Sequence, residues 1–140
     1  MKQIICTYAG VLGGLLASAL GGWDGALVAL LGFMAVDYVT GLLVAGVFHR
    51  SDKTSSGTLS SKAGFRGLVK KGVMLMIVLV GALLDDFLSL TFFRDSVIIA
   101  FLTNELISIV ENTALMGIPI PKALQKALDL LRQEEDARRQ

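Results

Sequence analysis

Four long apolar runs dominate this chain and constrain its fold more than any other feature. They cover residues 4–21, 25–48, 72–93 and 96–118, and a helix needs about 17–25 such residues to cross a bilayer. Hydrophobic residues make up 54% of the chain and charged residues only 18%, which leaves too little polar sequence to cover a soluble core. Only helices and closed barrels satisfy their own backbone in lipid. We therefore expect an all-α integral membrane protein with four transmembrane helices, or three if the first run is interfacial.

The lysines and arginines predict how these spans are oriented. Of the 13 basic residues, only Arg94 falls between the third and fourth runs, and none falls between the first and second. The other twelve lie before the first run, in the loop 49–71, or after the fourth run. Because cytoplasmic loops carry an excess of Lys and Arg, we expect both termini and the basic loop 49–71 in the cytoplasm. If the first run does not span, the N-terminus lies outside.

Small residues recur every fourth position along the first run, at Gly10, Gly14, Ser18 and Gly22. This spacing lets helix backbones approach closely in lipid, so it predicts a face for self-association or for packing within the chain. The run also has features of a signal peptide, with a cleavage-like triplet at 17–19. Its single preceding charge and the balance of the topology favour an uncleaved span.

The segment after the fourth run is predicted to be a separate helix within residues 119–140. Gly117 favours a helix end, and Pro119 and Pro121 prevent continuation of the fourth span. The apolar residues of the new helix fall on one stripe, formed by Leu124, Ala127, Leu128 and Leu131. We expect an amphipathic helix that lies on the inner membrane surface or pairs with a second copy.

Carboxyl groups within spans are costly, and they are functional candidates for that reason. Asp37, Asp85 and Glu105 each lie twelve or thirteen residues from the cytoplasmic end of their run, so we expect all three in one layer, roughly 18–20 Å above the inner surface. On the fourth run a polar stripe with helical spacing is formed by Asn104, Glu105, Ser108, Glu111 and Asn112. No basic residue falls inside the predicted spans to neutralise these acids. Two interpretations stay open: a buried hydrogen-bond network, and a surface that lines water after assembly.

The sequence contains none of the motifs of soluble enzymes. It has no phosphate-binding glycine loop, no metal-spaced histidine pair and no nucleophile beside its single histidine. Asp85 and Asp86 form an acidic pair at an outer helix end, where a solvated or packing role is expected rather than metal binding. The basic residues follow the membrane side instead of forming an aromatic-interleaved patch. We expect no enzymatic activity, no metal or other cofactor, and no nucleic-acid partner.

Several separate motifs resemble those of the phage lysis and toxin-secretion holins, in the family's order and spacing. The resemblance runs from about residue 34 to residue 131. It rests on the segments DYVTG at 37–41, LSSK at 59–62, GLVKK at 67–71, NELISIVEN at 104–112 and GIPIPK at 117–122. The positions that match the family pattern are Asp37, Thr40, Gly41, Asp85 or Asp86, Glu105, Ser108, Glu111, Asn112, Gly117, Pro119 and Pro121.

The resemblance implies a small protein that forms homo-oligomers in the host bacterial cytoplasmic membrane and opens large lesions there. A cell-wall hydrolase (endolysin), or in some relatives a large toxin, would pass through as cargo and the host cell would lyse. The resemblance also suggests a protein partner, an antiholin, which inhibits the holin. Two other functions remain open: a small proton or ion channel that passes no protein, and an accessory membrane assembly subunit.

Overall fold

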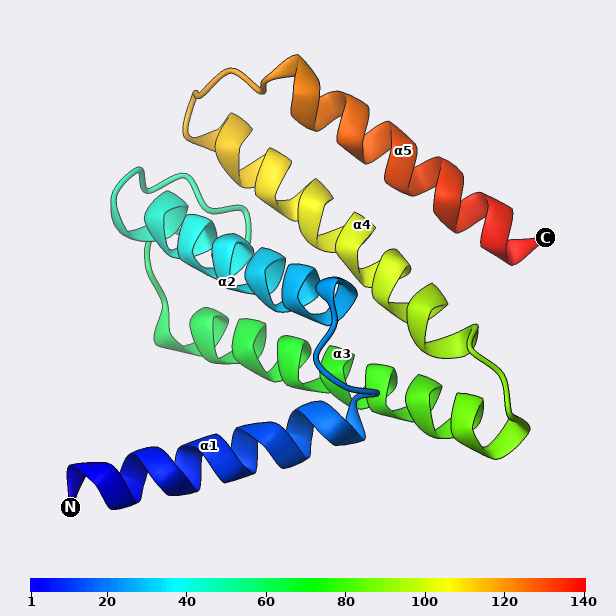
Figure 1. Ribbon diagram of the computed structural model, residues 1–140. Helices are drawn as coiled ribbons and strands as arrows, with labels where there is room; N and C mark the ends of the chain where they lie inside the picture. The colour runs from blue at the N-terminus through cyan, green and yellow to red at the C-terminus, as the bar shows by residue number, and fades with distance from the viewer.

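The computed structural model describes residues 1–140 and contains five α-helices and no strands. In chain order these are α1 (Lys2–Ala19), α2 (Gly25–Gly46), α3 (Ser61–Leu88), α4 (Phe93–Leu115) and α5 (Lys122–Arg139). Figure 1 shows α2, α3 and α4 as a bundle, with α1 diverging from it and α5 returning beside α4. Helix α4 is the central element, because it packs against α2, α3 and α5. The prediction of an all-α fold is confirmed.

Three of the five helices, α2, α3 and α4, are long and apolar enough to cross a membrane. Helix α1 has 18 residues, but it begins with Lys2 and Gln3 and contains three glycines, which lower its hydropathy. The structure therefore supports a membrane protein with three candidate spans, and the fourth span stays a prediction.

Local capping determines where the spans begin. The Asp24 side chain accepts a hydrogen bond from the backbone N–H of Leu27 at 2.9 Å and caps α2, and Ser60 caps α3 in the same way through Ala63 at 3.5 Å. The predicted third span began at Gly72, whereas α3 begins at Ser61. Hydropathy locates the start of the apolar run, and the cap locates the start of the helix. Residues 61–71 are therefore helical and not part of a loop.

The core of the bundle lies between α2, α3 and α4. Leu30 and Met34 of α2 pack with Val78 of α3 and with Ile98 and Leu102 of α4. Most other apolar side chains of these helices point outward, and 85% of Phe87, for example, is exposed. A bundle with so small a core and so much exposed apolar surface is suited to lipid rather than to water.

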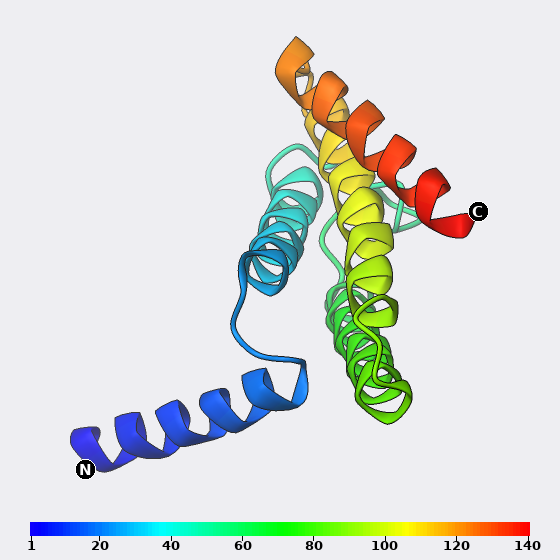
Figure 2. The same ribbon diagram turned by 45° about the vertical axis from the view of Figure 1, so that its right-hand side comes forward.

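Helix α1 has no neighbour along most of its length, and it extends away from the bundle in Figure 2. No atom lies within 4 Å of a Cβ placed on Gly10 or Gly14. Gly22 lies beyond the end of α1 with a φ of +95°, so it does not belong to the helix face predicted for it. Packing of this face within the chain is not seen, and self-association through Gly10, Gly14 and Ser18 stays a prediction.

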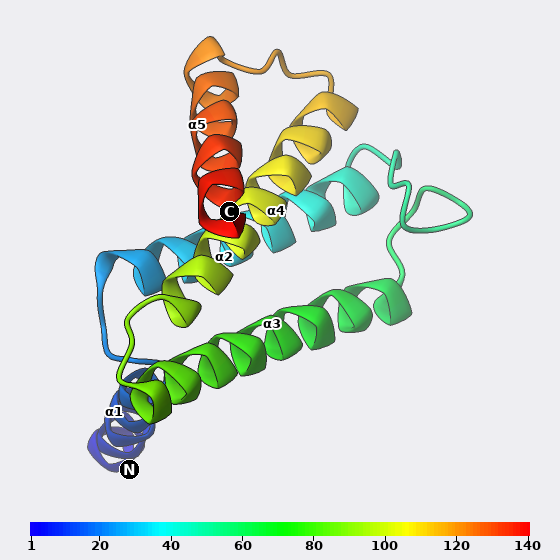
Figure 3. The same cartoon turned by 90° about the vertical axis from the view of Figure 1, so that its right-hand side faces the viewer.

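The chain turns sharply after α4 and then forms α5. Gly117 adopts a φ of +77°, and Pro121 with a φ of −60° immediately precedes α5. Figure 3 shows α5 running back beside α4, and Ala127, Leu128 and Leu131 are half-buried there. A helix is thus present where the sequence predicts one. Its position on the inner membrane surface stays a prediction.

Gly81 of α3 provides a test of the packing between α3 and α4. A Cβ at this position would lie 3.0 Å from Arg94 Cα, so Gly81→Leu should lower the free energy of unfolding in detergent micelles by about 1–3 kcal/mol. Gly72→Leu is the matched control, because nothing lies within 4 Å of a Cβ there. Equal stability of the two variants, measured by thermal unfolding, would show that α3 and α4 do not pack as described.

Candidate functional site

An ion cluster joins all three candidate spans near their middle. The Lys71 ammonium of α3 lies 2.8 Å from Asp37 Oδ2 of α2 and also bonds Glu105 Oε2 of α4. The exposed fractions of the three side chains are 13% for Lys71, 10% for Asp37 and 4% for Glu105. We call these three residues the Lys71 cluster. The cluster brings together two predicted site residues, Asp37 and Glu105. It also contains Lys71, which was predicted to lie in the loop 49–71.

Neutral polar groups extend the Lys71 cluster along α2 and α4. The Asn112 side-chain amide donates to Asp37 Oδ1 at 3.2 Å and to Thr40 Oγ1 at 3.0 Å, and Thr40 Oγ1 donates to the Asp37 backbone carbonyl at 3.0 Å. Gly41 lies beside this network, because a Cβ there would be 3.8 Å from Asn112 Nδ2. No buried side-chain nitrogen or oxygen in the chain lacks a hydrogen-bond partner. The buried polar side chains of the spans therefore satisfy one another within a single copy.

The polar stripe of α4 divides into two parts. Glu105 and Asn112 are buried, Ser108 is half-buried, and Asn104 and Glu111 are exposed. The buried members face α2 and α3. Glu105 and Asn112 therefore contribute to the interior of one copy. Asn104 and Glu111 lie on the surface of α4.

The Lys71 cluster carries two acids for one base and lies next to a cavity. A cavity of about 860 Å³ is lined by Asp37, Glu105 and Lys71, and also by the loop 51–60 and the first turns of α3. Buried charges are stable only when they are paired or reach water. The ammonium of Lys71 and the cavity together provide both conditions for Asp37 and Glu105.

Asp85 does not lie in this layer, which corrects the expectation of three carboxyl groups at one depth. It is fourteen residues beyond Lys71 on α3, roughly 21 Å along the helix axis. Its buried carboxylate accepts hydrogen bonds from the backbone N–H groups of Phe92 at 3.0 Å and of Phe93 and Arg94 at 2.9 Å. Asp85 therefore caps the start of α4 across the turn between α3 and α4, whereas Asp86 is exposed.

A second ion pair closes the end of the bundle opposite the loop 47–60. Arg94 Nη1 lies 2.6 Å from Asp24 Oδ2 and 3.1 Å from Asp95 Oδ1, and Arg94 Nε donates to the Leu20 carbonyl at 2.5 Å. These contacts connect the start of α4 to the segment between α1 and α2. The hydrogen bonds from Arg94 hold the pKa of the Asp24 carboxyl below its ordinary value of 3.8.

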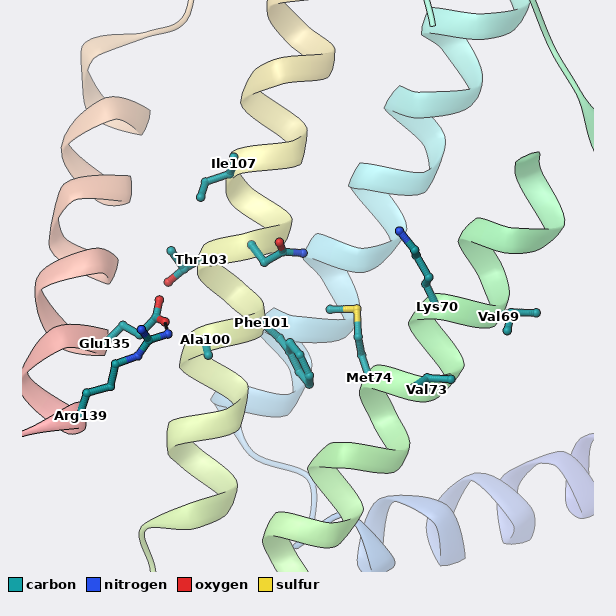
Figure 4. Close-up of a pocket in the computed structure, with 11 residues that line it drawn as sticks. Val69, Lys70, Val73, Met74, Ala100, Phe101, Thr103, Ile107, Glu135 and Arg139 are labelled. Carbon is teal, nitrogen blue, oxygen red and sulfur yellow. Dashed lines mark hydrogen bonds and ion pairs between the residues drawn. The ribbon is translucent and has the colours of Figure 1, made fainter. Parts of the chain in front are cut away.

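A second cavity, of about 620 Å³, lies between α3, α4 and α5 and is drawn in Figure 4. Its walls are mainly apolar, with Met74 of α3 and Phe101 of α4 among them. On the α5 side Glu135 and Arg139 form an ion pair near Thr103. The chain has no cluster of three His, Cys, Asp or Glu side chains that could hold a metal ion.

Lys71 should be the residue on which the bundle depends most. Lys71→Met leaves Asp37 and Glu105 as unpaired buried acids, so the free energy of unfolding in micelles should fall by about 3–5 kcal/mol. The triple variant Lys71→Met, Asp37→Asn, Glu105→Gln removes the unpaired charges and should recover most of that loss. Denaturation in micelles measures both. A triple variant no more stable than Lys71→Met would contradict the pairing.

The Asp24–Arg94 pair predicts a dependence of stability on acid. Because the pKa of Asp24 is lowered in the folded state, its contribution is present above pH about 3.8 and is lost as the pH falls through the folded-state pKa. Asp24→Asn keeps a capping side chain but should lower the melting temperature at pH 6 more than at pH 3. The control is Asp86→Asn, which removes an exposed outer acid that forms no ion pair. If the melting temperatures of wild type and Asp24→Asn changed in parallel with pH, this contribution of Asp24 would be ruled out.

Comparisons with known protein families and sequences found matches over most of this chain. A family model described as the bacteriophage holin family matches residues 14–133. An uncharacterized protein of Clostridium perfringens is 39% identical over 132 residues, covering 91% of this chain and 92% of the relative. An uncharacterized protein of Halalkalibacterium halodurans is 31% identical over 143 residues, covering 96% and 98%.

A more distant relative, from Bacillus phage phi105, is named "probable holin". It is 26% identical over 102 residues, which cover 72% of this chain and 70% of the relative. No solved structure matches the chain. The family model includes α2, α3 and α4 in full. On this evidence the chain is a member of the bacteriophage holin family.

Proposed function

We propose that this protein is a holin that assembles with copies of itself in the bacterial cytoplasmic membrane and opens lesions that release a cell-wall hydrolase. The observation that carries this proposal is the family match over residues 14–133, which includes the three candidate spans and most of α5. An endolysin or a large toxin would be the passing cargo. A protein of antiholin type would act on assembly.

The Lys71 cluster supports a closed state that precedes the lesion. In one copy Lys71 pairs with both Asp37 and Glu105, and Asn112 joins α4 to α2, so these polar groups do not face lipid. Separation of α2, α3 and α4 would expose the same groups. Their lowest-energy surroundings would then be water inside an assembly of several copies.

Two surfaces support assembly between copies. The exposed apolar side chains of α2 and α3 and the small-residue face of α1 have no partner within the chain. With 18 residues, α1 is about 27 Å long, which approaches the thickness of a hydrocarbon core. We propose that α1 is a fourth span, which places both termini and the loop 47–60 in the cytoplasm.

Loss of the membrane potential would favour the rearrangement. Moving one elementary charge across the membrane changes the free energy by about 2.3 kcal/mol per 100 mV. The Lys71 cluster combines charges of both signs from three helices. Movement of α3 relative to α2 and α4 would therefore couple to the potential.

Coexpression in a bacterium with a hydrolase that lacks a secretion signal tests the proposal. Culture turbidity should fall abruptly only when both proteins are present, since the hydrolase needs a hole large enough for a folded protein. Weakening the closed state by Asp37→Asn with Glu105→Gln should change the time of lysis at equal membrane expression. Asp86→Asn, an exposed acid outside the Lys71 cluster, is the control. An unchanged lysis time for the double variant would contradict the role of the cluster.

A small proton or ion channel is the second candidate, and one observation favours it. The cavity of about 860 Å³ reaches Asp37 and Glu105 from the end of the bundle that carries the basic loop, as half of an ion pathway would. A channel of that kind would dissipate the potential without releasing a folded cytoplasmic reporter. Release of a folded reporter the size of β-galactosidase would indicate a holin. Loss of the potential without release of the reporter would indicate a channel.

A further inference from the structure

Basic side chains from two parts of the chain surround the cavity at the end of the bundle that carries the loop 51–60. Besides Lys71, four cations line it: Lys53, Lys62, Arg66 and Lys70. Lys71 is paired with Asp37 and Glu105, whereas none of the other four forms a salt bridge anywhere in the chain. The cavity therefore concentrates four positive charges that have no negative partner.

Helix geometry places three of these cations on one face. Lys62, Arg66 and Lys70 are spaced four residues apart on α3, so they form a single row about 12 Å long. In Figure 4 the Lys70 side chain extends from α3 toward α2. Lys53 approaches from the loop on the other side, and its Nζ lies 4.0 Å from the position of a Cβ on Gly41. Cations thus face the same space from α3 and from the loop.

The remaining polar groups of the cavity are suited to an anion. Hydroxyl groups of the loop line it, from Ser51, Thr54, Ser55, Ser56 and Ser60. Of the three acids on its walls, Asp37 and Glu105 are bonded to Lys71, and Glu111 of α4 is the only one without an ion pair. Five cations against three acids leave an excess of two positive charges. Lysine, arginine and hydroxyl groups are the side chains that bind phosphate oxygens.

We propose that this cavity is a binding site for a phosphate ester anion, taken from the head group of an anionic phospholipid of the inner leaflet or from free phosphate in the cytoplasm. Its volume of about 860 Å³ is sufficient for a glycerophosphate group. Its place at the end of the spans is the level at which lipid head groups lie. Bound phosphate would hold the loop 51–60 against α3 and α2 above the Lys71 cluster. This inference does not depend on the release of any cargo.

The full chain, purified and reconstituted in nanodiscs, tests the proposal. The probes are phosphatidylglycerol titrated into phosphatidylcholine discs, and inorganic phosphate added to discs of phosphatidylcholine alone. Binding is followed by the fluorescence of a dye on Cys6, the single cysteine, and by native mass spectrometry. The cavity variant is Lys62→Gln, Arg66→Gln, Lys70→Gln. The matched control is Lys122→Gln, Lys126→Gln, Arg132→Gln, which removes three basic residues of α5 that lie outside the cavity.

We expect saturable binding of one of the two probes. The affinity for that probe should fall by about tenfold or more in the cavity variant and should stay unchanged in the α5 control. Saturation by phosphatidylglycerol identifies the lipid head group as the source, and saturation by inorganic phosphate identifies the free anion. Lys62→Arg with Lys70→Arg should bind as wild type does, which separates charge from folding. Equal losses in the cavity and α5 variants, or no saturable binding of either probe, would overturn the proposal.

Discussion

The ammonium group of Lys71 is the point at which three membrane helices meet. It pairs with Asp37 of α2 and Glu105 of α4 from its place on α3, and it is the only basic residue bonded to either acid. Without it, two carboxylates would lie unpaired in largely buried positions, at a cost of several kcal/mol for each ion. The small core around Leu30, Val78 and Ile98 orients the same helices. The ion cluster makes their register specific, because one residue of displacement would separate the charges.

The apolar runs, the helix break at Gly117 and the family resemblance were all readable from the sequence, because each depends on local composition or spacing. The position of Lys71 was not, since the apolar run begins only at Gly72 while the Ser60 cap starts the helix about three turns earlier. A capping serine followed by lysines and arginines at helical spacing was the available signal. Counting residues placed Asp85 at the same depth as Asp37, but the turn between α3 and α4 brings the backbone of Phe92, Phe93 and Arg94 to it instead. Such a contact depends on tertiary folding.

The position of α5 beside α4 determines where its charged side chains lie relative to the spans. Its charged end, with Glu135 and Arg139, lies beside Thr103 in the middle of α4. Charged groups at the depth of hydrocarbon cost about 2.5–3.5 kcal/mol each, and the charges at this end of α5 are paired, as Glu134 with Arg138 and Glu135 with Arg139. The sharp turn at Gly117 and Pro121 directs α5 back along α4. Helix α5 thereby covers one side of the apolar cavity between α3 and α4.

The most direct test of this account is a measurement of internuclear distances in lipid. In bilayers that contain the protein with ¹⁵N-labelled lysine and ¹³C-labelled aspartate and glutamate, solid-state NMR reports dipolar coupling between the Lys71 ammonium and nearby carboxyl carbons. Loss of this coupling in the Lys71→Arg variant would assign it to Lys71. We predict strong coupling from Lys71 to the carboxyl carbons of both Asp37 and Glu105. Coupling to only one of them, or to neither, in the membrane before lysis would contradict a bundle held together by this lysine.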